Sequence, residues 1–439
     1  MHERLAIEGG PKAVKDLPPA SPKLDARELW ALIEMWDMSP KTKEKIRKTL
    51  FSDPGVAGPH LFRYYGKRPS QVALAEKLLS KTIGVKHALA VNSCTSALIA
   101  SLRALGIGAG DEVIVPAYTF FATASAVVVC NAIPVICEVD DSLNMDAEAA
   151  RKLITRRTKA LLPVHMRGAP AQMDAIMGLA RSKGLPVVED VAQACGGSFG
   201  GKRLGAIGTM GCFSFDYYKV AVSGEGGFVT TDDAYLFMRA QSWHDAAACW
   251  RPDRFAKERV KGELFCGENY RMSELQGAVA AAQIRKLDAL LKALRRNKRR
   301  IREGIGKFPG VSFRRLADPK GDAGTVLMFF LPAAALKEKV VAALKAEGAP
   351  AASSYSSEVR DWHIYYHWDH LLQHKSVARD RLPWSAVPKA ALPRYSRDMC
   401  PRTLDYLARS VSVGIAPTHT AADCRAIAHG INKVLARYL

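Results

Sequence analysis

Residues 87–117 read HALAVNSCTSALIASLRALGIGAGDEVIVPA, and their pattern of apolar and polar residues indicates the fold. A short apolar run, HALAV, is followed by SALIASLRAL, which has helical composition, and then by a second apolar run, EVIVPA. A strand, a helix and another strand in this order form the unit from which parallel sheets are built. We therefore expect a sheet here with helices packed on its faces.

The alternation continues further along the chain. The segments IPVICEV (133–139), ALLPVH (160–165) and LPVVED (185–190) are typical of strands. Helices are expected between them, one near Asp146 and one over residues 173–184. The pattern predicts an α/β fold, a three-layer sandwich whose central sheet is mostly parallel and is covered by helices on both faces.

One apolar stretch needs a separate interpretation. Residues 113–137 carry no charge and are long enough to cross a bilayer. Pro116, Asn131 and Pro134 divide the stretch into strand, helix and strand. We therefore interpret it as buried core, and we expect no membrane as a partner.

The length of 439 residues allows two domains, or one large domain with an appendage. We expect an N-terminal arm and helix over residues 1–60, where Asp25 and Glu28 have the spacing of a capping box. A large α/β domain is expected over residues 61–299. A smaller α+β domain, ending in a helix, is expected over residues 300–439.

The chain is strongly basic, with 63 Lys and Arg residues against 43 Asp and Glu residues and a net charge of +20. The densest basic block, LRRNKRRIRE at residues 294–303, continues a segment of helical composition. No helix-turn-helix, zinc-finger or RNA-binding signature accompanies it, so we do not expect nucleic acid as a partner. We interpret the block as the solvated part of a long helix.

The cysteines and the N-terminus bear on location. Nine cysteines are scattered without a C-x-x-C pair, which is typical of reduced thiols. The start, MHERLAIEGGPKAVK, has charges where a secretion signal needs an apolar core. We therefore expect a cytoplasmic protein.

Polar residues follow three of the expected strands, at the sheet edge where open parallel sheets bind ligands. In VNSCTSAL (91–98), Cys94 and Thr95 lie among serines at a helix N-terminus, which favours a phosphate group, although serine and threonine are also ordinary helix caps. In VVEDVAQA (187–194), Asp190 follows an apolar strand. Its carboxylate could either hold a protonated ring nitrogen or cap a helix.

The third stretch is CFSFDYYKVAVSGEGG (212–227), in which Lys219 is the one cation. An amine in an apolar pocket has a lowered pKa and is partly neutral and nucleophilic near neutral pH. Such an amine can bond covalently to an aldehyde. A phosphate site, a lone carboxylate and a lysine together describe a site for pyridoxal 5′-phosphate.

Five segments of the chain resemble the DegT-type sugar aminotransferases, and they occur in the family's order. They are GDEVIVPAYTFFATASAV (110–127), TKALLPVHMRGAPAQMDAI (158–176), VVEDVAQACGG (187–197), GCFSFDYYK (211–219) and GENYRMSELQGAVAAAQI (267–284). The resemblance implies a pyridoxal phosphate enzyme of the aspartate aminotransferase fold, fold type I. It covers roughly residues 60 to 300 and extends more loosely to both ends.

The resemblance implies roles for residues around the cofactor ring. Lys219 would bind the cofactor covalently and Asp190 would pair with the pyridinium nitrogen. Phe120 would stack on the ring, and Gln193 would lie near its phenolic oxygen. Both Lys219 and Asp190 would be catalytic. A lysine at this position also separates the chain from the family's sugar dehydratases, which have a histidine there.

A second group of residues would bind the cofactor phosphate, according to the same resemblance. Thr95 and Ser214 would bind it within one subunit, and Asn269 would reach it from the partner subunit of a homodimer with shared sites. The family usually has glycine before the threonine where this chain has Cys94, so the backbone cradle departs from the pattern there. Arg167, in HMRG, stands where many relatives have an uncharged residue. Two interpretations stay open: it contacts an anionic substrate, or it is a surface arginine.

The resemblance implies an aminotransferase that moves an amino group from glutamate or glutamine to a keto sugar or keto cyclitol. LAIEGGPKAV (5–14) and the C-terminal region rich in tryptophan and histidine look most like the branch with scyllo-inosose aminotransferases and aminohydroxybenzoate synthases. That branch implies a secondary-metabolite or amino-sugar pathway. Two alternatives stay open: an aromatising lyase, and a pyridoxal-phosphate-binding regulator that uses its basic helix on DNA.

Histidines recur in HIYYHWDHLLQH, residues 363–374, at offsets of four, three and four. On one helix they would share a face, as metal ligands can, but an amphipathic helix with a histidine-rich polar side explains the spacing equally well. A straight helix cannot wrap four ligands round one ion. We expect no metal here, and a place at the mouth of the substrate pocket.

Overall fold

The computed structural model describes residues 3–14, 23–58, 61, 69–247, 257–353 and 355–439. The chain divides into two compact units, residues 1–63 and 64–439. The first contains η1 (Ala6–Glu8), α1 (Ala26–Glu34), α2 (Pro40–Ser52) and η2 (Pro54–Val56). The capping box predicted at the start of α1 is present, because Asp25 caps the helix and the Glu28 side chain accepts from the backbone N–H of Asp25.

The second unit is built on a mixed sheet of strand order β3-β2-β4-β5-β8-β9-β1. Its strands are β1 (His87–Val91), β2 (Glu112–Pro116), β3 (Ile133–Cys137), β4 (Thr158–Leu161), β5 (Val188–Asp190), β8 (Met210–Ser214) and β9 (Gly227–Thr231). Parallel bridges from Leu161 to Val187 and from Val164 to Asp190 join β4 to β5. β9 runs opposite to the other six strands, which all share one direction, so the predicted mostly parallel sheet is confirmed. The hairpin β6 (Ser198–Phe199) and β7 (Lys202–Arg203) lies outside this sheet.

Both faces of the sheet are covered, as successive residues of β2 illustrate. Val113 and Val115 belong to one hydrophobic core, and Ile114 belongs to another. Helices α4 (Cys94–Ala104), α5 (Ala122–Val129) and α8 (Ala234–His244) contribute to the first core. Helices α3 (Gln71–Ile83), α6 (Ala147–Leu153), α7 (Met173–Lys183) and α9 (Glu274–Gly304) contribute to cores on the other face.

The uncharged stretch 113–137 forms β2, α5 and β3, as its proline and asparagine punctuation predicted. All residues of both strands are buried. Within the described part of the chain, no helix is long and apolar enough to cross a membrane.

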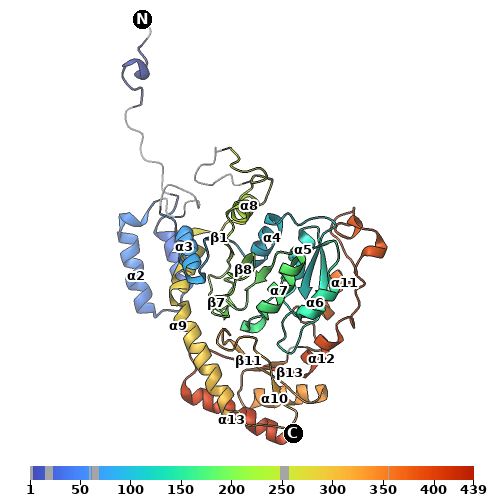
Figure 1. Cartoon of the computed structure of the whole chain (residues 1–439). Coiled ribbons are helices and arrows are strands. Elements are labelled where there is room, and N and C mark those ends of the chain that lie inside the picture. Colours follow the sequence, from blue (N-terminus) through green and yellow to red (C-terminus); the bar gives the residue numbers. More distant parts are fainter. Residues whose placement is uncertain (1–2, 15–22, 59–60, 62–68, 248–256, 354) are drawn as a thin grey trace. The chain divides into compact units, whose positions relative to one another are not determined.

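A second, antiparallel sheet has the order β10-β11-β13-β12. It comprises β10 (Ser312–Phe313), β11 (Val326–Phe330), β12 (Ala351–Ser353) and β13 (Ser410–Gly414), with η4 (Ala334–Leu336), α10 (Lys337–Ala346), α12 (Pro401–Arg409) and α13 (Ala421–Tyr438) around it. Figure 1 shows α9 (gold) running from α3 to α13. Leu287 and Leu291 of α9 pack in the core of the large sheet, whereas Leu294 and Ile301 pack in the core of the small one. The expected boundary between residues 299 and 300 falls inside this helix, and the domain division stays a prediction.

The histidine-rich segment is not the single helix expected from its spacing. It contains η5 (Tyr365–His367) and the short α11 (Asp369–Leu372), followed by η6 (Trp384–Ala386) and η7 (Lys389–Ala391). Its start is a turn at residues 362–363 followed by a bridge between Ile364 and Tyr118. The Thr119 N–H donates to the His363 carbonyl and the Phe121 N–H to the Trp362 carbonyl, and these bonds attach the turn to the segment after β2. The four histidines consequently contact different groups: His363 Asp361, His367 the Ser356 carbonyl, His370 the Phe121 ring, and His374 the rings of Trp384 and Tyr395.

Candidate active site

A cavity of about 950 Å³ opens at the carboxyl ends of the parallel strands. Seven of the eight site residues predicted from the sequence line it, from segments that follow β1, β2, β5 and β8. They are Cys94, Thr95, Phe120, Asp190, Gln193, Ser214 and Lys219. The expectation that the polar stretches meet at one edge of the sheet is therefore confirmed.

The N-terminus of α4 forms one wall of this cavity. Ser93 is the helix cap, and its hydroxyl accepts from the Ser96 N–H at 3.1 Å. Thr95 follows in the first turn, where N–H groups lie free of helical partners and favour an anion. Cys94 is buried, and burial, with the nearby charge of Asp190, raises the pKa of its thiol well above the usual range. The thiol is thus neutral and does not repel a phosphate group.

Asp190 ends β5 and is 3% exposed. Its carboxylate accepts hydrogen bonds from the Thr123 hydroxyl at 2.8 Å and from the Ala192 N–H at 3.0 Å. Burial nevertheless raises the pKa of Asp190, against the effect of these bonds and of the nearby Lys219 charge. No helix follows Asp190, so the helix-cap interpretation is wrong.

Among the described residues, no cation forms an ion pair with Asp190. A buried carboxylate is costly unless a cationic group accompanies it. The protonated ring nitrogen of pyridoxal phosphate is such a group, and the residues present therefore fit this cofactor.

Lys219 lies on a turn after β8, where its N–H donates to the Asp216 carbonyl at 3.0 Å. It lines the cavity but is only half-buried, and Tyr217 and Tyr218 before it are 72% and 86% exposed. The burial expected from its apolar neighbours is therefore wrong for the single chain. Ser214, at the end of β8, is buried and directed to the same cavity.

Phe120 and Gln193 lie on further parts of the cavity wall. The Phe120 side chain is 46% exposed, and its ring lies 5.3 Å from that of His363. The Gln193 side-chain oxygen accepts from the Arg167 N–H at 3.1 Å. His363 lines the cavity as well, so the expected place of the histidine-rich segment at the pocket mouth holds for this one histidine.

Asn269 is the predicted site residue that does not line the cavity. It is exposed, and its side-chain oxygen accepts from the Arg271 N–H at 3.3 Å. This hydrogen bond fixes the local turn and leaves the side-chain amide N–H₂ for another acceptor. A role for Asn269 in a partner's site stays a prediction.

Sequence reasoning missed the hydroxyl pair behind Asp190. Thr119 and Thr123 lie 2.7 Å apart through their hydroxyl oxygens, and both are 1% exposed. Thr119 precedes α5 and Thr123 lies in its first turn, so the helical i, i+4 rule does not predict the pair, and the sequence offered no clear signal for it. Thr123 orients the carboxylate of Asp190, and Thr119 orients Thr123.

The sequence model of the DegT/DnrJ/EryC1/StrS aminotransferase family matches residues 66–412. The chain belongs to this family. The resemblance stated from its motifs is therefore confirmed.

Two curated relatives illustrate the similarity. The L-glutamine:2-deoxy-scyllo-inosose aminotransferase of Streptomyces lividus is 35% identical over 319 residues, which cover 71% of this chain and 70% of the relative. The GDP-perosamine synthase of Caulobacter vibrioides is 40% identical over 227 residues, covering 50% of this chain and 58% of the relative. The matched part spans only about half to two-thirds of most such relatives.

Solved structures confirm the fold. The 3-amino-5-hydroxybenzoic acid synthase superposes with a TM-score of 0.70 at 28% identity, covering 84% of this chain and 91% of that one. An aminotransferase from Psychrobacter cryohalolentis gives a TM-score of 0.70 at 25% identity, covering 91% and 98%. The chain thus has the α/β architecture of these enzymes.

Proposed function

We propose that the chain is a pyridoxal-phosphate-dependent aminotransferase that moves an amino group from glutamate or glutamine to a keto sugar or keto cyclitol. One observation carries the proposal: a single cavity holds Lys219, the buried carboxylate of Asp190, which forms no ion pair with any described residue, and the helix N-terminus at Thr95. The names of the relatives, which include an aminotransferase that uses glutamine and a cyclitol ketone, support the substrate class.

The cavity offers a contact for each part of the cofactor. Thr95 and Ser214, with the first turn of α4, would hold the phosphate. Phe120 would stack on the ring, Gln193 would approach its phenolic oxygen, and Asp190 would hold its protonated nitrogen. When bound, the cofactor supplies an aldehyde that exchanges amines and a ring that accepts electrons.

The side chains of this protein then position the substrate and move its proton. The amino group of Lys219 would bind the cofactor and afterwards accept and return the α-proton of the donor as a general base and acid. Asp190 would keep the ring nitrogen protonated, because its buried negative charge favours a cation beside it. Thr123 would hold the carboxylate in place through its hydrogen bond.

The proposal is tested through covalent attachment of the cofactor. The purified protein should be yellow with pyridoxal phosphate and lose the colour on borohydride reduction, with the reduced cofactor on the peptide that contains Lys219. Lys219→Ala should lose transamination, whereas Lys183→Ala, on the distant end of α7, should keep it. A Lys219→Ala protein with the wild-type rate would refute the assignment.

The acceptor is tested by a screen of amino donors and ketones. Loss of the yellow absorbance with L-glutamine or L-glutamate, and its return with a keto cyclitol or a nucleotide-linked keto sugar, would identify the pair. No return with any ketone of either class would contradict the proposed acceptor.

A second candidate function is an aromatising lyase, which the structural similarity to 3-amino-5-hydroxybenzoic acid synthase favours. Both candidates need the same cofactor and lysine. Aromatic absorbance growing in a mixture of enzyme and cyclic aminoketone, without an amino donor, would favour the lyase.

We also propose a homodimer whose sites are shared between subunits. Lys219 is only half-buried, the exposed rings of Tyr217 and Tyr218 precede it in the chain, and the exposed ring of Phe120 lines the same cavity. A second copy would cover these rings, and its Asn269 would supply an amide to the phosphate.

A further inference from the structure

Arg167 occupies a strained turn in the cavity wall. It has φ 53° and ψ 37°, a left-handed conformation that is uncommon for residues other than glycine. Its N–H donates to the Gln193 side chain at 3.1 Å, and its carbonyl accepts from the Thr325 hydroxyl at 3.3 Å. Gly168 follows with φ 83°, and a Cβ there would meet the Thr325 hydroxyl oxygen at 2.5 Å. Such conformations persist where the surroundings fix them, and they cluster at functional sites.

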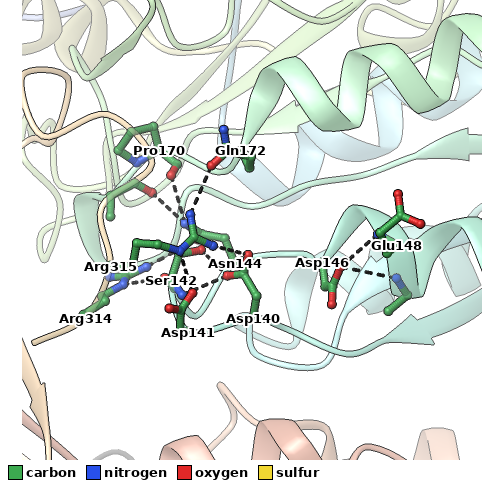
Figure 2. Close-up of polar contacts among 12 residues, drawn as sticks. Asp140, Asp141, Ser142, Asn144, Asp146, Glu148, Pro170, Gln172, Arg314 and Arg315 are labelled. Atoms are coloured by element: carbon green, nitrogen blue, oxygen red, sulfur yellow. Dashed lines mark hydrogen bonds and ion pairs between the residues drawn. The ribbon is translucent and has the colours of Figure 1, made fainter. Parts of the chain in front are cut away.

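A buried amide braces the rest of this turn (Figure 2). Asn144 is fully buried, and its side-chain oxygen accepts from the Met166 N–H at 3.0 Å and from Arg314 at 3.4 Å. Its N–H₂ donates to the Ala169 and Pro170 carbonyls at 3.3 and 3.0 Å. One side chain thus holds both ends of the turn, so the direction of the arginine between them is fixed.

Arg167 is partly buried and lines the cavity that contains Lys219. Its Nε donates to the Tyr118 hydroxyl at 3.2 Å. Within the described ranges, neither terminal nitrogen of this guanidinium has a hydrogen-bond acceptor and no carboxylate forms an ion pair with it. Tyr118, and to a smaller extent Asp361, raise the pKa of Arg167, so the guanidinium keeps its charge. The Asp361 carboxylate itself is bound to His363 at 2.8 Å.

Three other partly buried cations of this unit have acidic partners. Arg157 forms an ion pair with Glu112, Arg271 with Asp245, and Lys298 with Asp322, and all three carboxylates are buried. Arg314, which is 7% exposed, lacks an acidic partner among the described residues but donates to the Ser142 carbonyl and the Asn144 side chain. The terminal nitrogens of the partly buried Arg167, by contrast, have no acceptor within the described ranges. A permanent charge with open hydrogen-bond positions in a ligand cavity points to an anion brought by the ligand.

We propose that Arg167 binds a carboxylate of a substrate and selects substrates that carry one. The guanidinium is planar, and its two terminal nitrogens match the two oxygens of a carboxylate. The inference rests on the proposed function, which places an amino donor and a ketone acceptor in this cavity. The carboxylate belongs either to the amino-acid donor or to an acidic acceptor, and one experiment separates these sources.

The experiment measures equilibrium binding of inert probes by calorimetry, with and without added pyridoxal phosphate. Comparing the affinities for glutarate and glutaramide tests whether the carboxylate belongs to the amino donor, because the two molecules differ only in having carboxylates or neutral amides at their ends. D-glucuronate against D-glucose tests the acceptor source in the same way. The variants are Arg167→Asn, which tolerates the left-handed turn, and Arg167→Lys, which keeps the charge without the planar fork. Arg151→Asn, on exposed α6, is the matched control.

The wild type should bind the charged member of one pair roughly 10- to 100-fold more tightly, the range expected for charge-assisted hydrogen bonds. Arg167→Asn should abolish this preference, Arg167→Lys should keep part of it, and Arg151→Asn should leave it unchanged. A preference that survives in Arg167→Asn, or is absent from the wild type in both pairs, would overturn the inference.

Failure of the proposed function has a different readout. If Arg167→Asn weakens only the affinity for pyridoxal phosphate and leaves the probe preference intact, Arg167 serves the cofactor and the inference is wrong. If the wild type does not bind pyridoxal phosphate covalently, the proposed function fails, while the cofactor-free titrations still decide whether Arg167 selects carboxylates.

Discussion

Asp190 keeps a carboxylate in a buried position with two neutral hydrogen-bond donors, Thr123 and the Ala192 N–H. Asp190→Asn keeps the shape but removes the charge that would hold the ring nitrogen protonated. We expect the turnover number to fall roughly 10²-fold or more, as for other electrostatic contacts in active sites. Asp174→Asn, at the exposed start of α7, is the control and should keep the wild-type rate. A near-normal rate in Asp190→Asn would show that the carboxylate has only a structural role.

The raised pKa of Asp190 also predicts how the cofactor-free protein responds to pH. Because burial raises this pKa above its ordinary value of 3.8, the folded chain holds the proton more tightly than the unfolded chain does. The stability of the wild type relative to Asp190→Asn should therefore be highest in acid and fall as the pH rises from 3.8 through the raised pKa. Urea unfolding midpoints of the two cofactor-free proteins across this range test it. A difference that does not change with pH would contradict the prediction.

Individual site residues could be predicted to different degrees. Asp190 was accessible from sequence because an acidic residue after an apolar strand is costly without a partner. The partial exposure of Lys219 could not be predicted from the sequence, because the neighbouring Tyr217 and Tyr218 look apolar in sequence yet lie on an exposed turn. Thr123 was missed because a hydroxyl contact across 67 residues depends on the packing of α5 against β5.

At the scale of elements, close packing of β9 fixes the start of α4. A Cβ on Gly227 would meet the carbonyl carbon and oxygen of Ser93 at 2.5 Å and the Phe213 carbonyl oxygen at 2.7 Å. Gly227→Ala should therefore lower the free energy of unfolding by about 1–3 kcal/mol and weaken binding of pyridoxal phosphate, because the phosphate site moves.

The matched control for this prediction is Gly178→Ala in α7. A Cβ on Gly178 has no atom within 4 Å, so this variant should unfold as the wild type does or be stabilised by up to about 1 kcal/mol. Urea unfolding and cofactor titration of both variants test the comparison. Equal behaviour of the two alanine variants would show that the β9 contact does not position α4.

Strands and helices of the large sheet were predictable because their hydrophobic periods are regular and their caps are explicit. Ser70 and Gly84, for example, are the N-cap and the C-cap of α3. The histidine-rich segment was not predictable, because the backbone at its start, residues 362–365, forms hydrogen bonds with residues 117–121, far away in the sequence. A helical spacing of four and three therefore carried no information about a segment whose conformation is set by another element.

In the larger unit, α9 links the two cores and carries the basic block. Arg295 donates to the Asp322 carbonyl at 2.6 Å, and the Arg302 guanidinium lies 3.5 Å from the centre of the Phe313 ring. The predicted helix is confirmed, and part of its charge is used within the fold. These contacts are between elements distant in sequence, so composition alone could only indicate a solvated helix face.

The proposed dimer would complete the site with a residue from the second subunit. Lys219 and Asn269 lie on different segments, and only Lys219 lines the cavity of its own chain. In a two-fold dimer, Asn269 of each subunit would contribute to the other subunit's site. Lys219→Ala should therefore abolish activity, and Asn269→Ala should weaken cofactor binding and lower activity.

Mixing the two variants under conditions that allow subunit exchange should restore activity. A hybrid dimer would have one site with both defects and one site with neither. Random exchange of equal amounts makes about half of the dimers hybrids, so the mixture should have on average about half an intact site per dimer. Mixing each variant with itself is the control and should recover nothing. The measurement is the rate of amino transfer, with the dimer followed by sedimentation. Full exchange without recovery would exclude shared sites, and an active, strictly monomeric protein would exclude the dimer as well.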